Sequence, residues 1–281
     1  MNAIEIKGLQ KRYQGFSLND VSFCLPSGCI MGLVGENGAG KSTIIRLIMD
    51  AAKRDGGTVT VLGEDNTKRE FSDLKNDIGV VLDEAYFPEV LGAREINKIL
   101  KATYKNWDEK QFFELLQRFS LPLKKQVKDY SRGMKMKLAI AAALCHAPRL
   151  LILDEATSGL DPIVRDEILD ILNDFTRDEG HSILMSSHIL SDLEKSCDYI
   201  AFVHRGRLLF CEEKDRLLEE YGTVRLSKER FEDIPPEAVL GKRVSEYGVE
   251  ALVEKNKISD AFVVEHTGLE DIILFMVKGE K

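Results

Sequence analysis

The sequence predicts an α/β protein built on a parallel sheet, followed by a smaller α+β element. Two short, almost wholly apolar runs, 150–153 and 182–186, are typical of strands that are buried on both faces. A run with helical spacing, 163–175, separates them. A strand, a helix and a further strand at this spacing indicate parallel neighbours joined by a right-handed crossover. The pattern then changes near Gly222, which predicts the second element.

The part of the chain before this crossover predicts further strands and one helix. Period-two alternation or short apolar runs favour strands, and we expect them at 3–9, 16–25, 29–34, 58–62 and 78–82. Helical periodicity follows the third of these runs, over 42–50. The pair Gly56-Gly57 marks a turn before the fourth strand.

A helical insert is predicted over about 84–147. From Pro88 to Ala147 apolar residues recur at helical spacing, and Pro122 interrupts the pattern. The C-terminal element is expected to contain three short strands and a closing helix, at 223–226, 249–253, 261–264 and 269–277. The sequence therefore predicts two domains, 1–221 and 222–281.

Composition restricts the possible classes of function. The chain has 281 residues and a net charge of −8, which argues against nucleic acid as a partner. Its five cysteines show no metal-like or paired spacing, which favours a reducing cytosol. The most apolar run, 138–147, is shorter than the ~20 residues that a membrane-spanning helix needs. We therefore expect a cytoplasmic protein.

The residues 35–43, reading GENGAGKST, predict a phosphate-binding loop between a strand and a helix. Glycines let backbone N–H groups turn toward phosphate oxygens, and the helix N-terminus attracts anions. Lys41 is expected to contact the β- and γ-phosphates, and the Ser42 hydroxyl to bind Mg²⁺. The alternative is a glycine-rich turn that contains Lys-Ser by chance, which the strand–helix context disfavours. The residues expected to contact ATP are Gly35, Glu36, Asn37, Gly38, Ala39, Gly40, Lys41, Ser42 and Thr43.

Two adjacent acids, Asp154 and Glu155, follow an apolar strand. Ligand sites in parallel sheets form at the carboxyl ends of the strands. Since successive side chains on a strand point in opposite directions, we expect Asp154 to bind the metal and Glu155 to act as the base that polarises water. A solvated strand end or a helix cap is the alternative for an isolated Asp-Glu pair.

A third motif, Ser131-Arg132-Gly133-Met134-Lys135, opens a helix and predicts a second anion-binding site. In this order, the motifs resemble those of ABC ATPases over roughly residues 4–210. The resemblance implies a P-loop NTPase fold of the ABC type, with a mixed sheet core and an antiparallel β subdomain. It also implies that Tyr13 stacks on adenine, that Asp161 belongs to the loop Ser158-Gly159-Leu160-Asp161, and that His188 is the switch histidine.

Each of these three weaker residues also has a simpler interpretation. On their own, Tyr13 would be a packed or half-exposed aromatic side chain, His188 a helix-start or core histidine, and Asp161 a helix cap before Pro162. Their register with the stronger motifs favours the functional roles. The family resemblance further implies a head-to-tail homodimer, in which Ser131 and Gly133 of one copy face Lys41 and Ser42 of the other across the γ-phosphate.

Two positions depart from the family pattern. Asp83 stands where the family has glutamine, and we expect its carboxylate to be a ligand of the metal or of the attacking water. Arg132 replaces the first glycine of the third motif. Its side chain is expected either near the partner copy's γ-phosphate or in solvent.

The resemblance implies the ATP-hydrolysing subunit of an ABC transporter, and the residues 130–135 and 268–274 look like its drug or antimicrobial-peptide export branch. This subunit is expected on the cytoplasmic face of the membrane, bound to a separate permease through 84–92 and the helical insert. An ABC-type ATPase without a permease, as in iron–sulfur assembly, is the second hypothesis. A binding module that does not hydrolyse ATP is disfavoured because Lys41, Asp154, Glu155 and His188 are all present.

Overall fold

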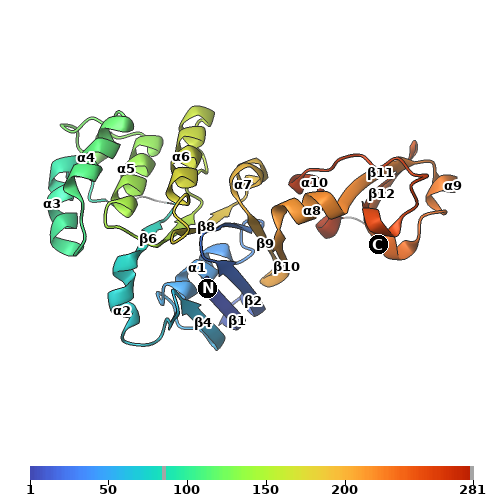
Figure 1. Cartoon of the computed structure of the whole chain (residues 1–281), viewed down its shortest axis with the longest axis horizontal. Helices are drawn as coiled ribbons and strands as arrows, with labels where there is room; N and C mark the ends of the chain where they lie inside the picture. Colours follow the sequence, from blue (N-terminus) through green and yellow to red (C-terminus); the bar gives the residue numbers. More distant parts are fainter. Residues whose placement is uncertain (84–86, 279–281) are drawn as a thin grey trace. The chain divides into compact units, whose positions relative to one another are not determined.

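The computed structural model describes residues 1–83 and 87–278, and the chain divides into two compact units (Figure 1). The first unit comprises Met1–Ile189 and Tyr199–Cys211, and the second comprises Leu190–Asp198 and the residues from Glu212 onward. The helices α7 (Leu190–Ser196) and α8 (Lys214–Glu220) therefore belong to the second unit. The predicted functional division at residues 221 and 222 remains a prediction.

A six-stranded sheet forms the base of the first unit, in the order β10-β9-β3-β8-β7-β6. The pairs β3–β8, β3–β9, β7–β8 and β6–β7 are parallel, as the apolar runs predict. Its strands are β3 (Ile30–Val34), β6 (Ile78–Val81), β7 (Leu150–Asp154), β8 (Ser182–Ser187), β9 (Tyr199–His204) and β10 (Arg207–Glu213).

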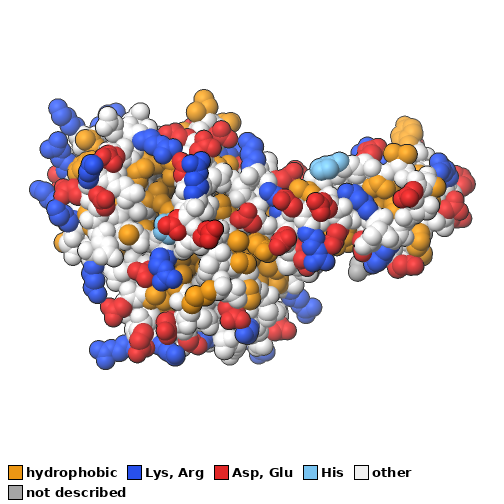
Figure 2. All heavy atoms as spheres, in the orientation of Figure 1, with side chains coloured by type: hydrophobic (Ala, Val, Ile, Leu, Met, Phe, Trp, Pro, Cys, Tyr) orange, Lys and Arg blue, Asp and Glu red, His pale blue; other side chains and the backbone are white. Residues whose placement is uncertain are grey.

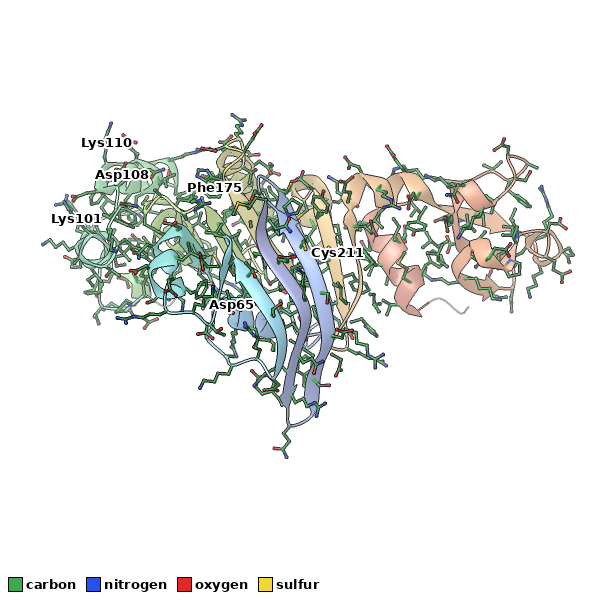
Figure 3. The ribbon with its side chains drawn as sticks, turned by 60° about the horizontal axis from the view of Figure 1, so that its bottom comes forward. Asp65, Lys101, Asp108, Lys110, Phe175 and Cys211 are labelled. Atoms are coloured by element: carbon green, nitrogen blue, oxygen red, sulfur yellow. The ribbon has the colours of Figure 1, made fainter. Side chains whose placement is uncertain are left out.

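A second, antiparallel sheet of the same unit has the order β2-β1-β4-β5. Its strands are β1 (Asn2–Tyr13), β2 (Phe16–Pro26), β4 (Gly56–Val61) and β5 (Glu64–Asp65). Figure 3 shows β1 and β2 as two long neighbouring strands, with Asp65 labelled at the end of β5. The expected combination of a parallel core and an antiparallel subdomain is confirmed.

Three helices of the first unit, beginning at Glu109, Arg132 and Pro162, follow residues whose side chains cap them. The Asp108 carboxylate accepts from Gln111 N at 2.9 Å before α4, near Lys101 and Lys110 in Figure 3. Pro122 lies between α4 and α5, where the helical pattern was expected to break. The helices are α1 (Lys41–Ile48), α2 (Phe71–Leu74), α3 (Ala93–Thr103), α4 (Glu109–Arg118), α5 (Arg132–Leu144) and α6 (Pro162–Phe175).

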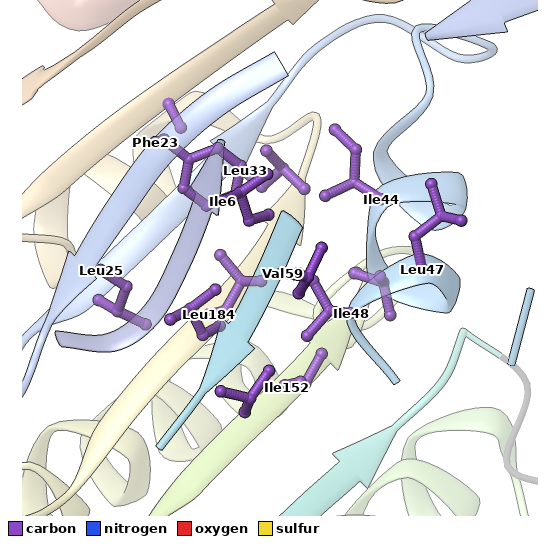
Figure 4. Packing of buried hydrophobic residues seen from close by; sticks show 14 of the residues in the cluster. Ile6, Phe23, Leu25, Leu33, Ile44, Leu47, Ile48, Val59, Ile152 and Leu184 are labelled. Carbon is purple, nitrogen blue, oxygen red and sulfur yellow. The ribbon is translucent and has the colours of Figure 1, made fainter. Parts of the chain in front are cut away.

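One apolar core connects the two sheets of the first unit through α1 (Figure 4). It joins Ile6, Phe23 and Val59 of the antiparallel sheet to Leu33, Ile152 and Leu184 of the parallel sheet. Ile44 and Ile48 of α1 are fully buried in it. The loop between β3 and α1 is therefore fixed at both of its ends by buried side chains.

The second unit contains a three-stranded antiparallel sheet in the order β11-β13-β12. Its further elements are α9 (Lys228–Phe231) and α10 (Leu269–Lys278), beside β11 (Tyr221–Leu226), β12 (Val239–Ser245) and β13 (Gly248–Glu254). The strand predicted at 261–264 is wrong: these residues form no strand, Val263 is 81% exposed, and only the following residue, Glu265, forms an isolated bridge, to Thr223. The tight turn that follows Ser245 lets β12 pair with β13, so the local hairpin provides the third strand.

Acidic and basic side chains alternate over much of the face shown in Figure 2. Of the helices in residues 1–83 and 87–278, none combines the length and the hydropathy that crossing a membrane requires.

Candidate active site

The phosphate loop occupies 35–40, between β3 and α1. Gly38 and Gly40 have left-handed φ angles of 82° and 115°, which residues with a Cβ rarely adopt. A Cβ on Gly40 would lie 2.7 Å from the Leu18 side chain and 2.8 Å from the Phe16 ring. The glycine therefore lets the loop approach β2 closely, and α1 begins with its N–H groups toward the loop.

The turn between β9 and β10 is hydrogen-bonded to this loop. Gly206 N donates to Ala39 O at 3.0 Å, and Asn19 N donates to Gly206 O at 2.8 Å. Gly206 has a φ of 75°, and a Cβ there would lie 1.9 Å from Ser17 O. Glycine is required at this position by both conformation and space, and it joins the loop to β2.

We expect Gly206→Ala to destabilise the first unit more than a left-handed backbone alone would. The conformation costs about 1–2 kcal/mol, and the clash with Ser17 O should cost at least about 1 kcal/mol more. Gly15→Ala is the matched control, since Gly15 has a φ of 84° and open space around its Cβ position. Denaturant unfolding of both variants checks this, and equal losses would show that the close approach has no energetic role.

Lys41 begins α1 and is only 6% exposed. Its ammonium donates to Gly35 O at 2.7 Å and to Glu36 O at 3.4 Å, and it lies 3.2 Å from Glu155 Oε1. A buried ammonium needs such partners. Because its stem is flexible, the same donors can turn to phosphate oxygens when a nucleotide occupies the loop.

The two acids after β7 are held by the neighbouring strand β8, in which Ser186 pairs with Asp154 in parallel register. Ser186 Oγ donates to Asp154 Oδ1 at 2.6 Å, while Glu155 N donates to both Ser186 Oγ and Ser186 O at 3.1 Å. Asp154 is 7% exposed. Glu155 has a φ of 53°, a conformation typical of functional sites that costs about 1–3 kcal/mol.

Glu155 links the loop to the predicted switch histidine. Its Oε2 lies 2.7 Å from His188 Nδ1, while its other oxygen faces Lys41. The carboxylate is largely enclosed, whereas His188 is about half exposed. The imidazole and the ammonium thus fix the orientation of this carboxylate, which is the group predicted to accept a proton from water.

Three further predicted residues line one cavity of about 750 Å³. Ser42 comes from α1, Asp83 follows β6, and Asp154 ends β7. The three oxygen side chains assigned to the metal thus line one cavity, which Arg46 and Lys75 line as well. Within the described residues, no group of three His, Cys, Asp or Glu side chains forms a metal site by itself.

Ser131, Gly133 and Asp161 are not among the described residues that line this cavity. Ser131 Oγ caps α5 by accepting from Met134 N at 3.3 Å, and Asp161 Oδ1 caps α6 by accepting from Val164 N at 3.1 Å. The cap interpretation of Asp161 is therefore confirmed, while its role toward nucleotide stays a prediction.

Tyr13 ends β1 and is 47% exposed, so it is not a core aromatic residue. The Lys11 ammonium lies 5.3 Å from the centre of its ring. The other loop residues differ in exposure: Glu36, Asn37, Gly38 and Ser42 are exposed, Gly35, Ala39 and Gly40 are buried, and Thr43 is intermediate.

The sequence did not reveal Ser186, Gly206 and His204 as parts of this site. His204 Nδ1 lies 3.2 Å from Glu36 Oε1. Ser186 was detectable in part, because a polar residue ends an apolar strand beside the one that ends in Asp154. The other two act through contacts that no local pattern indicates.

Comparison with known proteins gives consistent matches. The ABC transporter family matches residues 18–158. The lantibiotic transport ATP-binding protein SrtF of Streptococcus pyogenes is 36% identical over 215 residues, which cover 75% of this chain and 91% of SrtF. The bacitracin transport ATP-binding protein BcrA of Enterococcus faecalis is 36% identical over 209 residues, covering 73% and 68% of the two chains.

A solved structure shares the fold. It is the dimeric structure of an ATP-binding cassette in a post-hydrolysis state, bound to ADP and Pi, with a TM-score of 0.67 and 21% identity over 75% of this chain and 98% of that one. The family match and the 36% identity to SrtF, found on a chain with this loop and these two acids, show that the protein belongs to the ABC transporter family as an ATP-binding subunit that hydrolyses ATP.

Proposed function

We propose that two copies of this chain close head to tail on two Mg²⁺–ATP and power export through a separate membrane permease. The observation that supports this best is the arrangement around Glu155, which contacts Lys41 of the phosphate loop on one side and His188 on the other. In the proposed reaction, Lys41 donates to the β- and γ-phosphates. Glu155 accepts the proton of the attacking water, and His188 orients that carboxylate.

The proposal requires two copies because the second anion site of each copy lies away from that copy's own phosphate loop. Ser131 and Gly133 lie at the N-terminus of α5, a helix of 13 residues, whose dipole favours an anion there. They lie outside the cavity that Ser42 and Asp154 line. Since ABC cassettes dimerise, we infer that these N–H and hydroxyl groups contact the ATP of the partner copy, in a closed two-fold arrangement.

The donors in the cavity fit a magnesium ion. Mg²⁺ prefers one or two carboxylates, a hydroxyl and phosphate oxygens to a cage made only of protein. Ser42, Asp83 and Asp154 supply such a set. When bound, the ion would neutralise charge on the phosphates. The chain's own contribution is to orient Asp154 through Ser186.

Asp154→Asn is expected to raise the Mg²⁺ concentration for half-maximal ATP turnover by about 10–100-fold, since a neutral amide is the weaker ligand. Asparagine still accepts from Ser186, so the strand register should survive. Asp73→Asn on α2, whose side chain is 86% exposed, is the control. A magnesium titration identical to that of the unmodified protein would remove Asp154 from the metal site.

Export is inferred from the relatives and from the helical insert. SrtF is a lantibiotic transport protein and BcrA a bacitracin transport protein, so we infer antimicrobial peptides or similar drugs as the cargo class. For the permease, we propose docking on the insert, where α3 and α4 line a hollow of about 690 Å³. Of the predicted docking stretch 84–92, residues 84–86 lie outside the described residues. This docking places the chain on the cytoplasmic face of the membrane.

Purification of the tagged, full-length chain from gently solubilised membranes tests the transport role. A multi-span membrane protein should co-purify in stoichiometric amount and raise the ATPase rate. Recovery with a cytosolic partner alone would favour the second hypothesis, an ABC-type ATPase without a permease.

A further inference from the structure

The side chain of Arg132 has a partner within its own chain. Its Nη2 lies 2.8 Å from Asp83 Oδ1, across 49 positions of sequence. The guanidinium also packs against Gly159. A Cβ at that position would lie 2.7 Å from Arg132 Nη1 and 3.1 Å from Arg132 Cζ. The side chain is about half exposed, so it partly meets the solvent expectation, and its place relative to a partner copy's phosphate stays a prediction.

The contact joins three segments of the first unit that are distant in sequence. Asp83 follows β6, Arg132 is the first residue of α5, and Gly159 lies between β7 and α6 with a φ of 67°. Glycine at this position adopts the left-handed conformation without strain, and because it has no Cβ it leaves room for the guanidinium. The first turn of α5, which includes Ser131 and Gly133, is thereby connected to the residue that lines the metal cavity.

Asp83 therefore contacts Arg132 and also lines the cavity proposed for the metal. One of its oxygens is bonded to Arg132, and the same residue lines the cavity with Ser42 and Asp154. A carboxylate only accepts hydrogen bonds, so unlike the family's glutamine it attracts both an arginine and a metal ion. Both partners of the ion pair are about half exposed, so the pair is weak enough to exchange.

We propose that Arg132 is a positioning residue that competes with the metal for the Asp83 carboxylate, and that Mg²⁺–ATP draws Asp83 off Arg132. This rests on the proposed metal site. Release of Arg132 frees the first turn of α5, so that metal binding in one copy alters the surface it presents to the other. Because such coupling is reciprocal, the pair must weaken metal binding as much as the metal weakens the pair.

A double-mutant cycle in the full-length protein tests this, with Mn²⁺ as the probe and a non-hydrolysable ATP analogue present. Arg132→Gln should tighten Mn²⁺ binding by about two- to fivefold, because Asp83 is then free. Arg132→Lys, which keeps the charge, should remain closer to the unmodified protein. In an Asp83→Asn background, Arg132→Gln should have no effect. The matched control is Arg149→Gln, an arginine that is also half exposed and lies near Asp77.

The outcomes distinguish the proposed metal role of Asp83 from the proposed exchange between Arg132 and the metal. If Asp83→Asn alone leaves Mn²⁺ affinity unchanged, the metal role of Asp83 in the proposed function fails. If Asp83→Asn weakens binding but Arg132→Gln weakens it too, or acts equally in both backgrounds, only the exchange between Arg132 and the metal is overturned.

Discussion

Glu155→Gln is expected to lower ATP turnover by about 10²–10⁴-fold, the usual contribution of a general base, while ATP stays bound. Glutamine has nearly the shape of glutamate and still accepts a hydrogen bond, so the contact to Lys41 can persist. It is not basic enough to take a proton from water. Single-turnover hydrolysis, with bound nucleotide measured in parallel, checks this.

The closed dimer should accumulate in the same variant, because hydrolysis is the step that releases it. Size-exclusion chromatography with Mg²⁺–ATP is expected to show a stable dimer for Glu155→Gln and a transient one for the unmodified chain. Glu64→Gln, which removes a solvent-exposed partner of Lys68, is the control. Hydrolysis by Glu155→Gln at the unmodified rate would disprove the assignment of the base.

The parts of the fold that local sequence determines were predictable. Strand β3 is apolar and buried, β7 is apolar and buried up to its last residue, Asp154, and α1 has helical spacing with buried Ile44 and Ile48. The strand prediction at 261–264 was wrong because β-branched residues indicate a preference for strand conformation but do not identify a strand to pair with. The true third strand, β12, contains Gly241 and is half exposed, so its pattern is weak.

The site residues likewise divide into those that local sequence predicts and those that depend on contacts between distant segments. Lys41, Asp154 and Glu155 were predictable because their chemistry lies in contiguous residues beside a strand or helix. Ser186 became functional only through the register of β8 with β7. The contact between Asp83 and Arg132 depends on how the end of β6 meets the start of α5, which neither segment encodes by itself.

Lys41→Ala is expected to weaken ATP binding by roughly 10²-fold, because truncating one partner of a buried charge pair costs about 2–5 kcal/mol. The ammonium is 6% exposed and supplies the loop's compact cation. Calorimetric titration with a non-hydrolysable ATP analogue measures the loss. Lys68→Ala, at an exposed lysine, is the control. ATP affinity within threefold of the unmodified chain would contradict the assigned role.

The ion pair between Lys41 and Glu155 adds a sharper expectation. In the absence of nucleotide the ammonium lies 3.2 Å from Glu155 Oε1, so the phosphate competes with the carboxylate for it. Glu155→Gln removes the negative charge, and ATP should therefore bind more tightly than to the unmodified chain. The gain should vanish in a Lys41→Ala background, since no ammonium remains to be released. A gain of equal size in both backgrounds would mean that Glu155 repels the phosphates directly and that its contact with Lys41 does not regulate binding.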